Sequence, residues 1–199
     1  MTMKNSQEVS YNIVLVEDDP IVRSGLAMMV ESFGHNIIGE ANNGIAAIDL
    51  TLEKKPDLII MDINLPKLDG ISAIEKINAT KTTPCIIITG YRQQEFAKNA
   101  NKAGVFGYLQ KPIDEYELKT MIGIAMGRFY ESIQLRQEAE VAKKALEERK
   151  LIERAKGVLM DRYAYQEATA MKYLQRKSSE KNAKIADIAR AILKEENLL

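Results

Sequence analysis

The chain has 199 residues, of which 46% are hydrophobic and 28% are charged, a composition typical of a folded protein in water. This length allows one large domain, or a domain of ordinary size followed by a small one. The apolar runs are too short to span a bilayer and the first residues lack the apolar core of a secretory signal, so we expect a cytoplasmic protein with no membrane partner.

The formal net charge is zero, but the charges are unevenly distributed along the chain. Residues 1–131 contain 13 Lys and Arg against 17 Asp and Glu, whereas residues 132–199 contain 15 against 11. The two parts therefore carry net charges of −4 and +4 and are expected to meet different partners. A surplus of this size does not by itself indicate nucleic-acid binding.

The single cysteine and the single histidine are not expected to carry chemistry. Cys85 has no second thiol to pair with, and the apolar run that follows it predicts a small buried hydrophobe. His35 follows Gly34 in a predicted loop and has no second histidine as a fellow ligand, so a metal or catalytic role is not expected.

Between residues 11 and 130, short apolar runs alternate with helical patterns. Alternation of this kind indicates a parallel sheet covered on both faces by helices. We therefore predict an α/β protein of the flavodoxin-like, doubly wound (βα)5 type, preceded by a short tail over residues 1–10. The predicted strands cover residues 12–16, 36–40, 57–61, 84–89 and 105–109, and the predicted helices cover residues 20–33, 44–55, 70–78 and 93–102 and continue from 114 onward.

In a sheet of this type, ligands bind beyond the carboxyl ends of the strands, where the strand order reverses. If that order is 2-1-3-4-5, the first and third strands are neighbours and their ends share one crevice. Asp19, before Pro20, is a better candidate for a helix N-cap than for a ligand. The polar residues at the strand ends are Glu17, Asp18 and Asp19 after the first strand, Asp62 after the third, Thr89 after the fourth and Lys111 after the fifth.

Carboxylates crowded at one edge repel each other and normally recruit a cation. Oxygen ligands without His or Cys favour a hard divalent ion, and a small number of acids with room for water and phosphate suits Mg²⁺. Glu17, Asp18 and Asp62 are the candidate ligands, and the backbone carbonyl of Asn64 could complete the coordination sphere.

A carboxylate beside Mg²⁺ is a competent nucleophile toward phosphorus and gives an acyl phosphate. Asp62 is the expected nucleophile. Lys111 would neutralise the phosphoryl oxygens, Thr89 would donate a hydrogen bond to them, and the small Gly90 would leave the approach open.

Four motifs within residues 11–130 resemble the receiver domain of two-component response regulators: "IVLVEDDP", "DLIIMDINLPKLDG", "IIITG" and "GYLQKP". The resemblance implies that a partner histidine kinase phosphorylates Asp62, that Glu17 and Asp18 form the acidic pair that binds Mg²⁺, and that Thr89 and Lys111 are the switch hydroxyl and the family's lysine. Tyr108 occupies the position of the switch aromatic, which turns inward on activation, although it could be an ordinary half-buried aromatic. Glu17 stands where many members have Asp.

Haloacid-dehalogenase-like phosphatases also use an aspartate at the end of a strand. Such an enzyme needs a second Asp at position 64, where this chain has Asn64. We therefore expect no enzyme activity beyond self-phosphorylation and dephosphorylation.

The helical pattern continues beyond the predicted receiver domain, with no Gly or Pro between Arg128 and Lys156. Residues 131–150 are predicted to be a connector helix with a coiled-coil-like seam, which indicates a homodimer on activation. The alternative is a solvated helix in a monomer. The seam positions, at alternating spacings of four and three, are Leu135, Ala139, Ala142 and Leu146.

Residues 151–199 contain three short apolar periods and predict a small all-α domain of three helices. Five cations lie beside or between these helices and could contact nucleic-acid phosphates, although a charge group of this kind is more often only a solvated face. They are Lys156, Arg176, Lys177, Lys181 and Lys184.

The stretches "AKGVLM", "YLQRKS" and "NAKIADIA" within residues 150–193 resemble the ANTAR domain of antitermination regulators, with Ser178 and Ser179 where many members have Ala. The resemblance implies binding to paired RNA hairpins in nascent transcripts, which stops a terminator from forming. Tyr163 or Tyr165 would be available to stack on bases.

Two other output functions stay open at this point. One is a receiver-controlled, DNA-binding transcription factor, although no helix-turn-helix signature with a turn glycine is evident in residues 151–199. The other is a dimerisation or docking protein in a phosphorelay.

Overall fold

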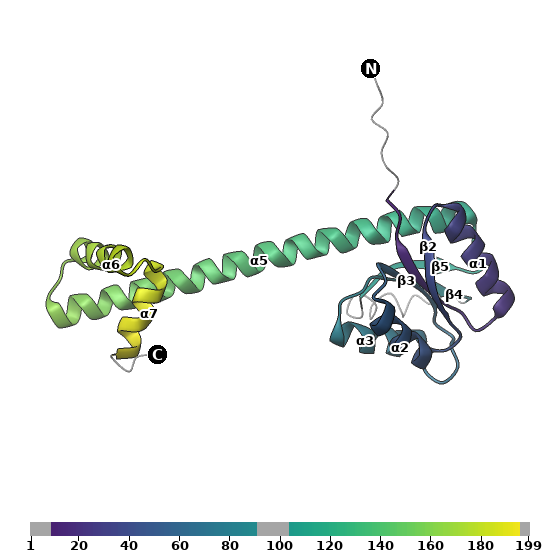
Figure 1. Ribbon diagram of the computed structural model, residues 1–199, viewed down its shortest axis with the longest axis horizontal. Helices are drawn as coiled ribbons and strands as arrows, with labels where there is room; N and C mark the ends of the chain where they lie inside the picture. The colour runs from purple at the N-terminus through teal and green to yellow at the C-terminus, as the bar shows by residue number, and fades with distance from the viewer. Residues whose placement is uncertain (1–8, 91–103, 196–199) are drawn as a thin grey trace, which may run out of the picture. The chain divides into compact units, whose positions relative to one another are not determined.

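A computed structural model of the chain describes residues 9–90 and 104–195 (Figure 1). The chain divides into two compact units, Met1–Ser132 and Ile133–Leu199. The long helix α5 (Glu115–Tyr163) begins in the first unit and ends in the second. The helix that we predicted across residues 93–102 lies outside the described residues.

The first unit contains a five-stranded parallel sheet with the order β2-β1-β3-β4-β5. This is the order of the flavodoxin-like fold, so the predicted fold class is confirmed. All five residues of β3 are buried, which explains why its first four residues are apolar without alternation. The strands are β1 (Asn12–Val16), β2 (Asn36–Ala41), β3 (Leu58–Asp62), β4 (Cys85–Thr89) and β5 (Val105–Gln110).

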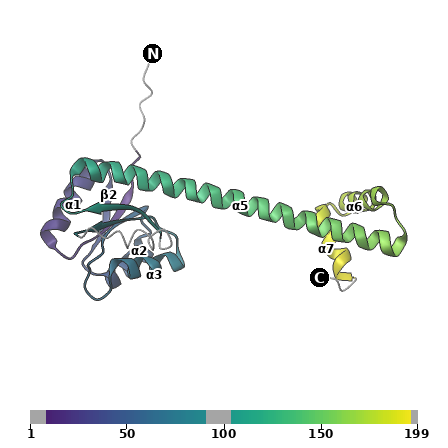
Figure 2. The same cartoon turned by 180° about the vertical axis from the view of Figure 1, so that it is seen from behind.

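Helices cover both faces of the sheet, as Figures 1 and 2 show from opposite sides. α2 (Gly44–Lys54) and α3 (Gly70–Thr80) pack on one face, where Ile74 and Ile77 are buried. α1 (Pro20–Ser32) and the first turns of α5 pack on the other, where Val30 and Leu118 are buried. Cys85 is buried at the start of β4, as expected for a small hydrophobe.

Polar side chains fix the starts of these helices. The Asp19 carboxylate accepts hydrogen bonds from the backbone N–H groups of Ile21 and Val22, so its predicted capping role is confirmed. Asn43 caps α2 through Ala46, and Asp69 caps α3 through Ser72. Each capping residue ends the loop that follows a strand, so the caps also orient the loops at the carboxyl edge of the sheet.

The second unit is built from the last turns of α5 and two further helices, α6 (Glu167–Lys181) and α7 (Ile185–Glu195). Leu159, Leu174 and Leu193 form the centre of its core. The first apolar period that we assigned to a separate helix is therefore the end of α5, because no residue between positions 128 and 156 breaks the helix. Ser178 donates a hydrogen bond of 2.5 Å to the Ala183 carbonyl across the α6–α7 turn.

Within the described ranges, no helix is both long enough and apolar enough to cross a membrane.

The Asp69 cap gives a testable contribution to stability. Burial alone raises the pKa of Asp69, but hydrogen bonds that involve Ser72 outweigh it, so the pKa lies below its ordinary value. We expect Asp69→Ala to lower the free energy of unfolding at pH 7 by about 1 kcal/mol. Because the folded pKa is lowered, this contribution is present above the unfolded pKa of about 3.9 and is lost as the pH falls through the folded value. Urea unfolding between pH 7 and about pH 3 measures it.

Asp69→Asn is the matched control, because asparagine caps helices as well as aspartate but does not titrate. It should cost little at pH 7. A penalty for Asp69→Ala that stays the same at every pH would contradict the assignment of this pKa.

Candidate functional site

Four of the predicted site residues meet at the carboxyl edge of the sheet. Glu17 and Asp18 follow β1, Asp62 is the last residue of β3, and Lys111 follows β5. Because β1 pairs directly with β3, the two acidic strand ends are neighbours. The strand order thus brings together residues that are up to 94 positions apart in the chain.

Carboxylate oxygens of Glu17, Asp18 and Asp62 all lie within 4.8 Å of one another. Glu17 and Asp62 are buried, and Asp18 is exposed. Burial raises the pKa of the Glu17 carboxyl, although the neighbouring Lys111 opposes this shift. Three carboxylate ligands at this spacing, one of them exposed to water, could hold a hard divalent cation that keeps several of its water ligands.

Lys111 bridges the two buried carboxylates. Its Nζ lies 2.8 Å from Oε2 of Glu17 and 2.5 Å from Oδ2 of Asp62. Desolvation alone would lower the pKa of Lys111, but the two hydrogen-bonded carboxylates outweigh it and raise the pKa. The ammonium therefore stays charged and offsets the repulsion between the two acids.

The second oxygen of Asp62 is held by the loop that follows it. Oδ1 accepts a hydrogen bond of 3.1 Å from the backbone N–H of Asn64, whose side chain is exposed. The participation of the Asn64 carbonyl in metal binding stays a prediction.

Thr89 and Gly90 lie at the end of β4, beside Lys111. The Thr89 carbonyl accepts a hydrogen bond of 2.9 Å from the backbone N–H of Lys111. Gly90 and Lys111 line the same pocket of about 590 Å³. The expectation that Gly90 leaves the approach to Asp62 open stays a prediction.

Tyr108 lies inward in this structure. Its ring packs against the core layer between the sheet and helices α2 and α3, and burial raises the pKa of its hydroxyl. Among the described residues, the buried Tyr108 hydroxyl has no hydrogen-bond partner. Its role as a switch stays a prediction.

Sequence reasoning missed two residues that position the acids. Arg23 donates to the Glu17 backbone carbonyl at 2.7 Å and to the Glu40 carboxylate at 2.9 Å. Gly70 packs so closely that a Cβ there would press on the Asp62 carbonyl oxygen. The Gly70 signal was visible, since a glycine directly after the Asp69 cap suggests a close backbone approach, but nothing in the sequence links Arg23 to this site.

In the second unit, the structure argues against a phosphate-contacting role for Lys156. This residue is only 8% exposed, and its Nζ lies 2.7 Å from Glu167 and 2.9 Å from Glu153. Hydrogen bonds to Glu167 and then Glu153 raise its pKa. Its charge is used to tie α6 to α5, which composition alone could not reveal.

The other four cations that we predicted to contact RNA are open to solvent or partly so. Arg176 and Lys177 share the Glu180 carboxylate, at 3.5 and 2.7 Å, and Lys181 and Lys184 are exposed at the α6–α7 turn. Their contacts with RNA stay predictions.

Both units match known protein families. Residues 13–123 match the response regulator receiver domain, and residues 140–193 match the ANTAR domain. Transcriptional regulatory protein PdtaR of Mycobacterium tuberculosis is 35% identical over 185 residues, which are 93% of this chain and 90% of that protein. The chain belongs to the response regulators with an ANTAR domain.

Solved structures agree on the first unit of this response regulator. A LuxR-family two-component response regulator from Aurantimonas sp. SI85-9A1 shares 33% identity with a TM-score of 0.57, over 60% of this chain and 86% of that one. The response regulator domain of Thermotoga maritima CheB shares 27% identity with a TM-score of 0.56, over 60% and 98%. Receiver domains bind Mg²⁺ at an acidic pocket, and the Glu17, Asp18 and Asp62 cluster has this character.

The close approach at Gly70 yields a prediction about the site's scaffold. Gly70→Ala should lower the free energy of unfolding by about 1 to 3 kcal/mol, because the added methyl meets backbone that cannot move away freely. Urea unfolding followed by circular dichroism measures the change.

Gly25→Ala in α1 is the matched control. A Cβ at Gly25 meets nothing within 4 Å among the described residues, so this change should stabilise the protein by up to about 1 kcal/mol. Equal effects of the two substitutions would show that the Gly70 contact does not constrain the loop.

Proposed function

We propose that this response regulator receives a phosphoryl group on Asp62 from a sensor histidine kinase and, once phosphorylated, binds RNA hairpins in nascent transcripts as a homodimer to control antitermination. The observation that supports this proposal is the convergence of three carboxylates and one ammonium at the carboxyl edge of the sheet, in a chain that also contains an ANTAR domain. Nascent transcripts would place its action in the cytoplasm.

The site supports phosphoryl transfer to Asp62 through the charges around it. Glu17, Asp18, Asp62 and the Asn64 carbonyl would hold Mg²⁺, which would neutralise negative charge on the incoming group. The Lys111 ammonium already contacts Asp62 Oδ2 and can shift to a phosphoryl oxygen. Thr89 can donate a hydrogen bond from the neighbouring strand end. With Asn64 in place of a second catalytic aspartate, we propose no turnover beyond self-phosphorylation and dephosphorylation.

The connector part of α5 supports the dimer. Its four seam residues are exposed in the single chain, with Leu135 59% and Leu146 54% exposed. A second copy of the helix would cover these apolar side chains. Two ANTAR domains held together would bind two hairpins with a raised effective concentration for the second contact.

The phosphoacceptor assignment is tested by labelling. Incubation with isotopically labelled acetyl phosphate and Mg²⁺ should label the parent chain, and Asp62→Asn should abolish the label because an amide is not a nucleophile toward phosphorus. EDTA should abolish the label on the parent. Asp69→Asn, which changes a carboxylate in the same loop outside the acidic cluster, should leave labelling intact. Equal labelling of Asp62→Asn and the parent would refute the assignment.

The output is tested with the parent chain activated by beryllofluoride, a phosphoryl mimic. Activation should convert monomer to dimer in light scattering and should tighten filter binding of hairpin RNA, with a steep dependence on salt. Leu135→Lys should block the dimer and weaken RNA binding, because it places charge in the seam.

Gln137→Lys adds the same charge to the opposite side of α5 and serves as the matched control. Tighter binding of duplex DNA than of hairpin RNA would favour the transcription-factor alternative. Binding of neither nucleic acid would favour a phosphorelay docking protein.

A further inference from the structure

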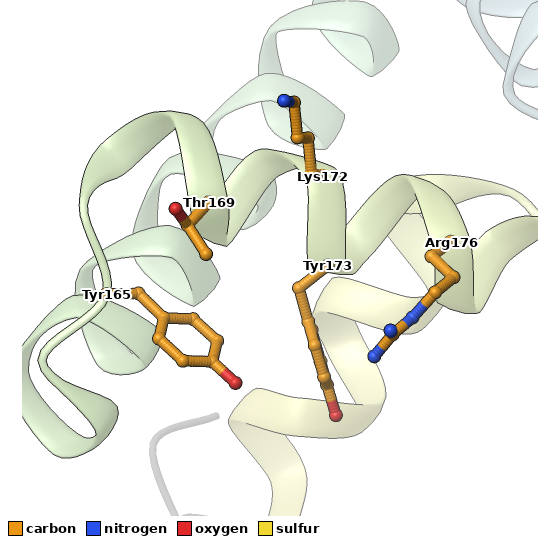
Figure 3. A pocket seen from close by; sticks show the side chains of 5 residues that line it. All are labelled: Tyr165, Thr169, Lys172, Tyr173 and Arg176. Carbon is orange, nitrogen blue, oxygen red and sulfur yellow. The ribbon is translucent and has the colours of Figure 1, made fainter.

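The second unit contains a small pocket at the junction of α5 and α6, outside the receiver site. It has a volume of about 240 Å³, below the roughly 300 Å³ at which sites for drug-sized ligands begin. Figure 3 shows the five side chains that line it. They are Tyr165, Thr169, Lys172, Tyr173 and Arg176.

Two tyrosine rings form the aromatic walls of this pocket. The ring centroids of Tyr165 and Tyr173 lie 6.1 Å apart, with planes inclined by 55°. Both rings are half-buried against the core of the unit, and in Figure 3 they extend toward the same open side. The walls are therefore anchored from behind, while part of each ring is available to a ligand.

The spacing of the rings limits how a flat group can bind. A planar group between two parallel rings needs about 3.5 Å on each side, which is about 7 Å in all. The observed 6.1 Å lies within the range of about 4.5 to 7 Å for two rings in direct contact, so no base fits between them and a base would contact the parts of the rings at the mouth of the pocket. In Figure 3, Arg176 lies beside Tyr173 on the side away from Tyr165, and its Cζ is 5.7 Å from the ring centroid. Tyr165 and Arg176 therefore lie on opposite faces of Tyr173, and a base can stack only on the part of the ring that they leave open.

The charged residues that line the pocket are both positive. Lys172 and Arg176 are exposed, and none of the five lining residues is acidic. In Figure 3, the Lys172 side chain extends away from the rings, where it can reach a group outside the pocket. In Figure 3, the Thr169 methyl group faces the rings and its hydroxyl points away from them, so Thr169 adds apolar surface to the pocket. A flat aromatic surface between two long cations suits an unpaired nucleotide, whose base is planar and whose phosphates are anionic.

The contacts behind the pocket hold its two walls in place. Tyr165 follows Ala164, whose φ of 51° turns the chain sharply at the end of α5. In the first turn of α6, the Glu167 carboxylate is tied to the buried Lys156 of α5 at 2.7 Å. The rings are thus positioned before any ligand arrives, which reduces the entropy cost of binding.

We propose that this pocket binds one unpaired base of an RNA hairpin loop against the open parts of the Tyr165 and Tyr173 rings, while Lys172 and Arg176 contact the flanking phosphates. The inference rests on the proposed RNA-binding function and deepens it, because it assigns the base contact to a defined pocket. It also adds Lys172 and Tyr173, which sequence reasoning did not single out.

The test uses the full chain activated by beryllofluoride and hairpin RNAs selected for binding from a pool with a constant stem and a randomised loop. Tyr173→Ala and Tyr165→Ala should each weaken binding of the selected hairpins by roughly 5- to 150-fold, the range for loss of one base–aromatic stack. Tyr173→Phe should bind within about twofold of the parent, because stacking needs the ring and not the hydroxyl. Lys172→Ala should reduce the slope of log affinity against log salt concentration by about the amount expected for one phosphate contact.

Lys194→Ala, an exposed cation near the end of α7, is the matched charge control and should leave the salt dependence unchanged. Circular dichroism of each variant reports whether the helices survive. If folded Tyr173→Ala binds the selected hairpins as tightly as the parent, the pocket does not hold a base, although the proposed function stands. An equal loss of affinity for a loop-free RNA duplex would likewise exclude a base in the pocket. If the parent chain binds no hairpin, both the proposed RNA-binding function and the base-binding pocket are wrong. Binding of a peptide at the pocket would instead indicate a protein-docking site.

Discussion

The arrangement of the first unit depends on the balance between two buried carboxylates and one ammonium. Glu17 and Asp62 would repel each other in a setting with little water, and Lys111 offsets that repulsion through contacts of 2.8 and 2.5 Å. Removing one partner of a buried ion pair costs about 3 to 5 kcal/mol, since the remaining charge is left without compensation. The same three side chains therefore stabilise the fold and place a cation beside Asp62. A substitution of any of them is expected to change both the stability of the protein and the reactivity of Asp62.

The fold and most of this site were predictable because both follow from strand ends. The four consecutive apolar residues of β3 require cover on both faces, and a parallel sheet gathers the carboxyl ends of its strands at one edge. Contacts between side chains that are distant in the sequence were not predictable. Arg23 supports Glu17 through its backbone carbonyl, and no residue pattern encodes such a contact. Lys156 looked like any other surface cation, but it is buried between two acids that lie three and eleven positions away.

In the second unit, short helices bury little apolar surface, so polar and aromatic contacts take on more of the structural role. Lys156 ties α6 to α5, and Ser178 closes the turn to α7. Tyr165 and Tyr173 are partly buried against the core and also line the pocket. The core and the pocket therefore share residues. An apolar periodicity in the sequence can identify the core residues, but it cannot tell which of them also contact a ligand.

The uninterrupted course of α5 has a consequence for how chains of this kind can change over time. Within a helix, adding or deleting one residue rotates everything beyond it by about 100°, whereas seven residues complete nearly two whole turns. Leu118 is fixed in the receiver core and Leu159 in the ANTAR core, and both belong to this helix. A length change of seven residues in the connector would therefore keep its apolar seam on nearly one face of α5, whereas a change of one residue within the seam would turn part of it away.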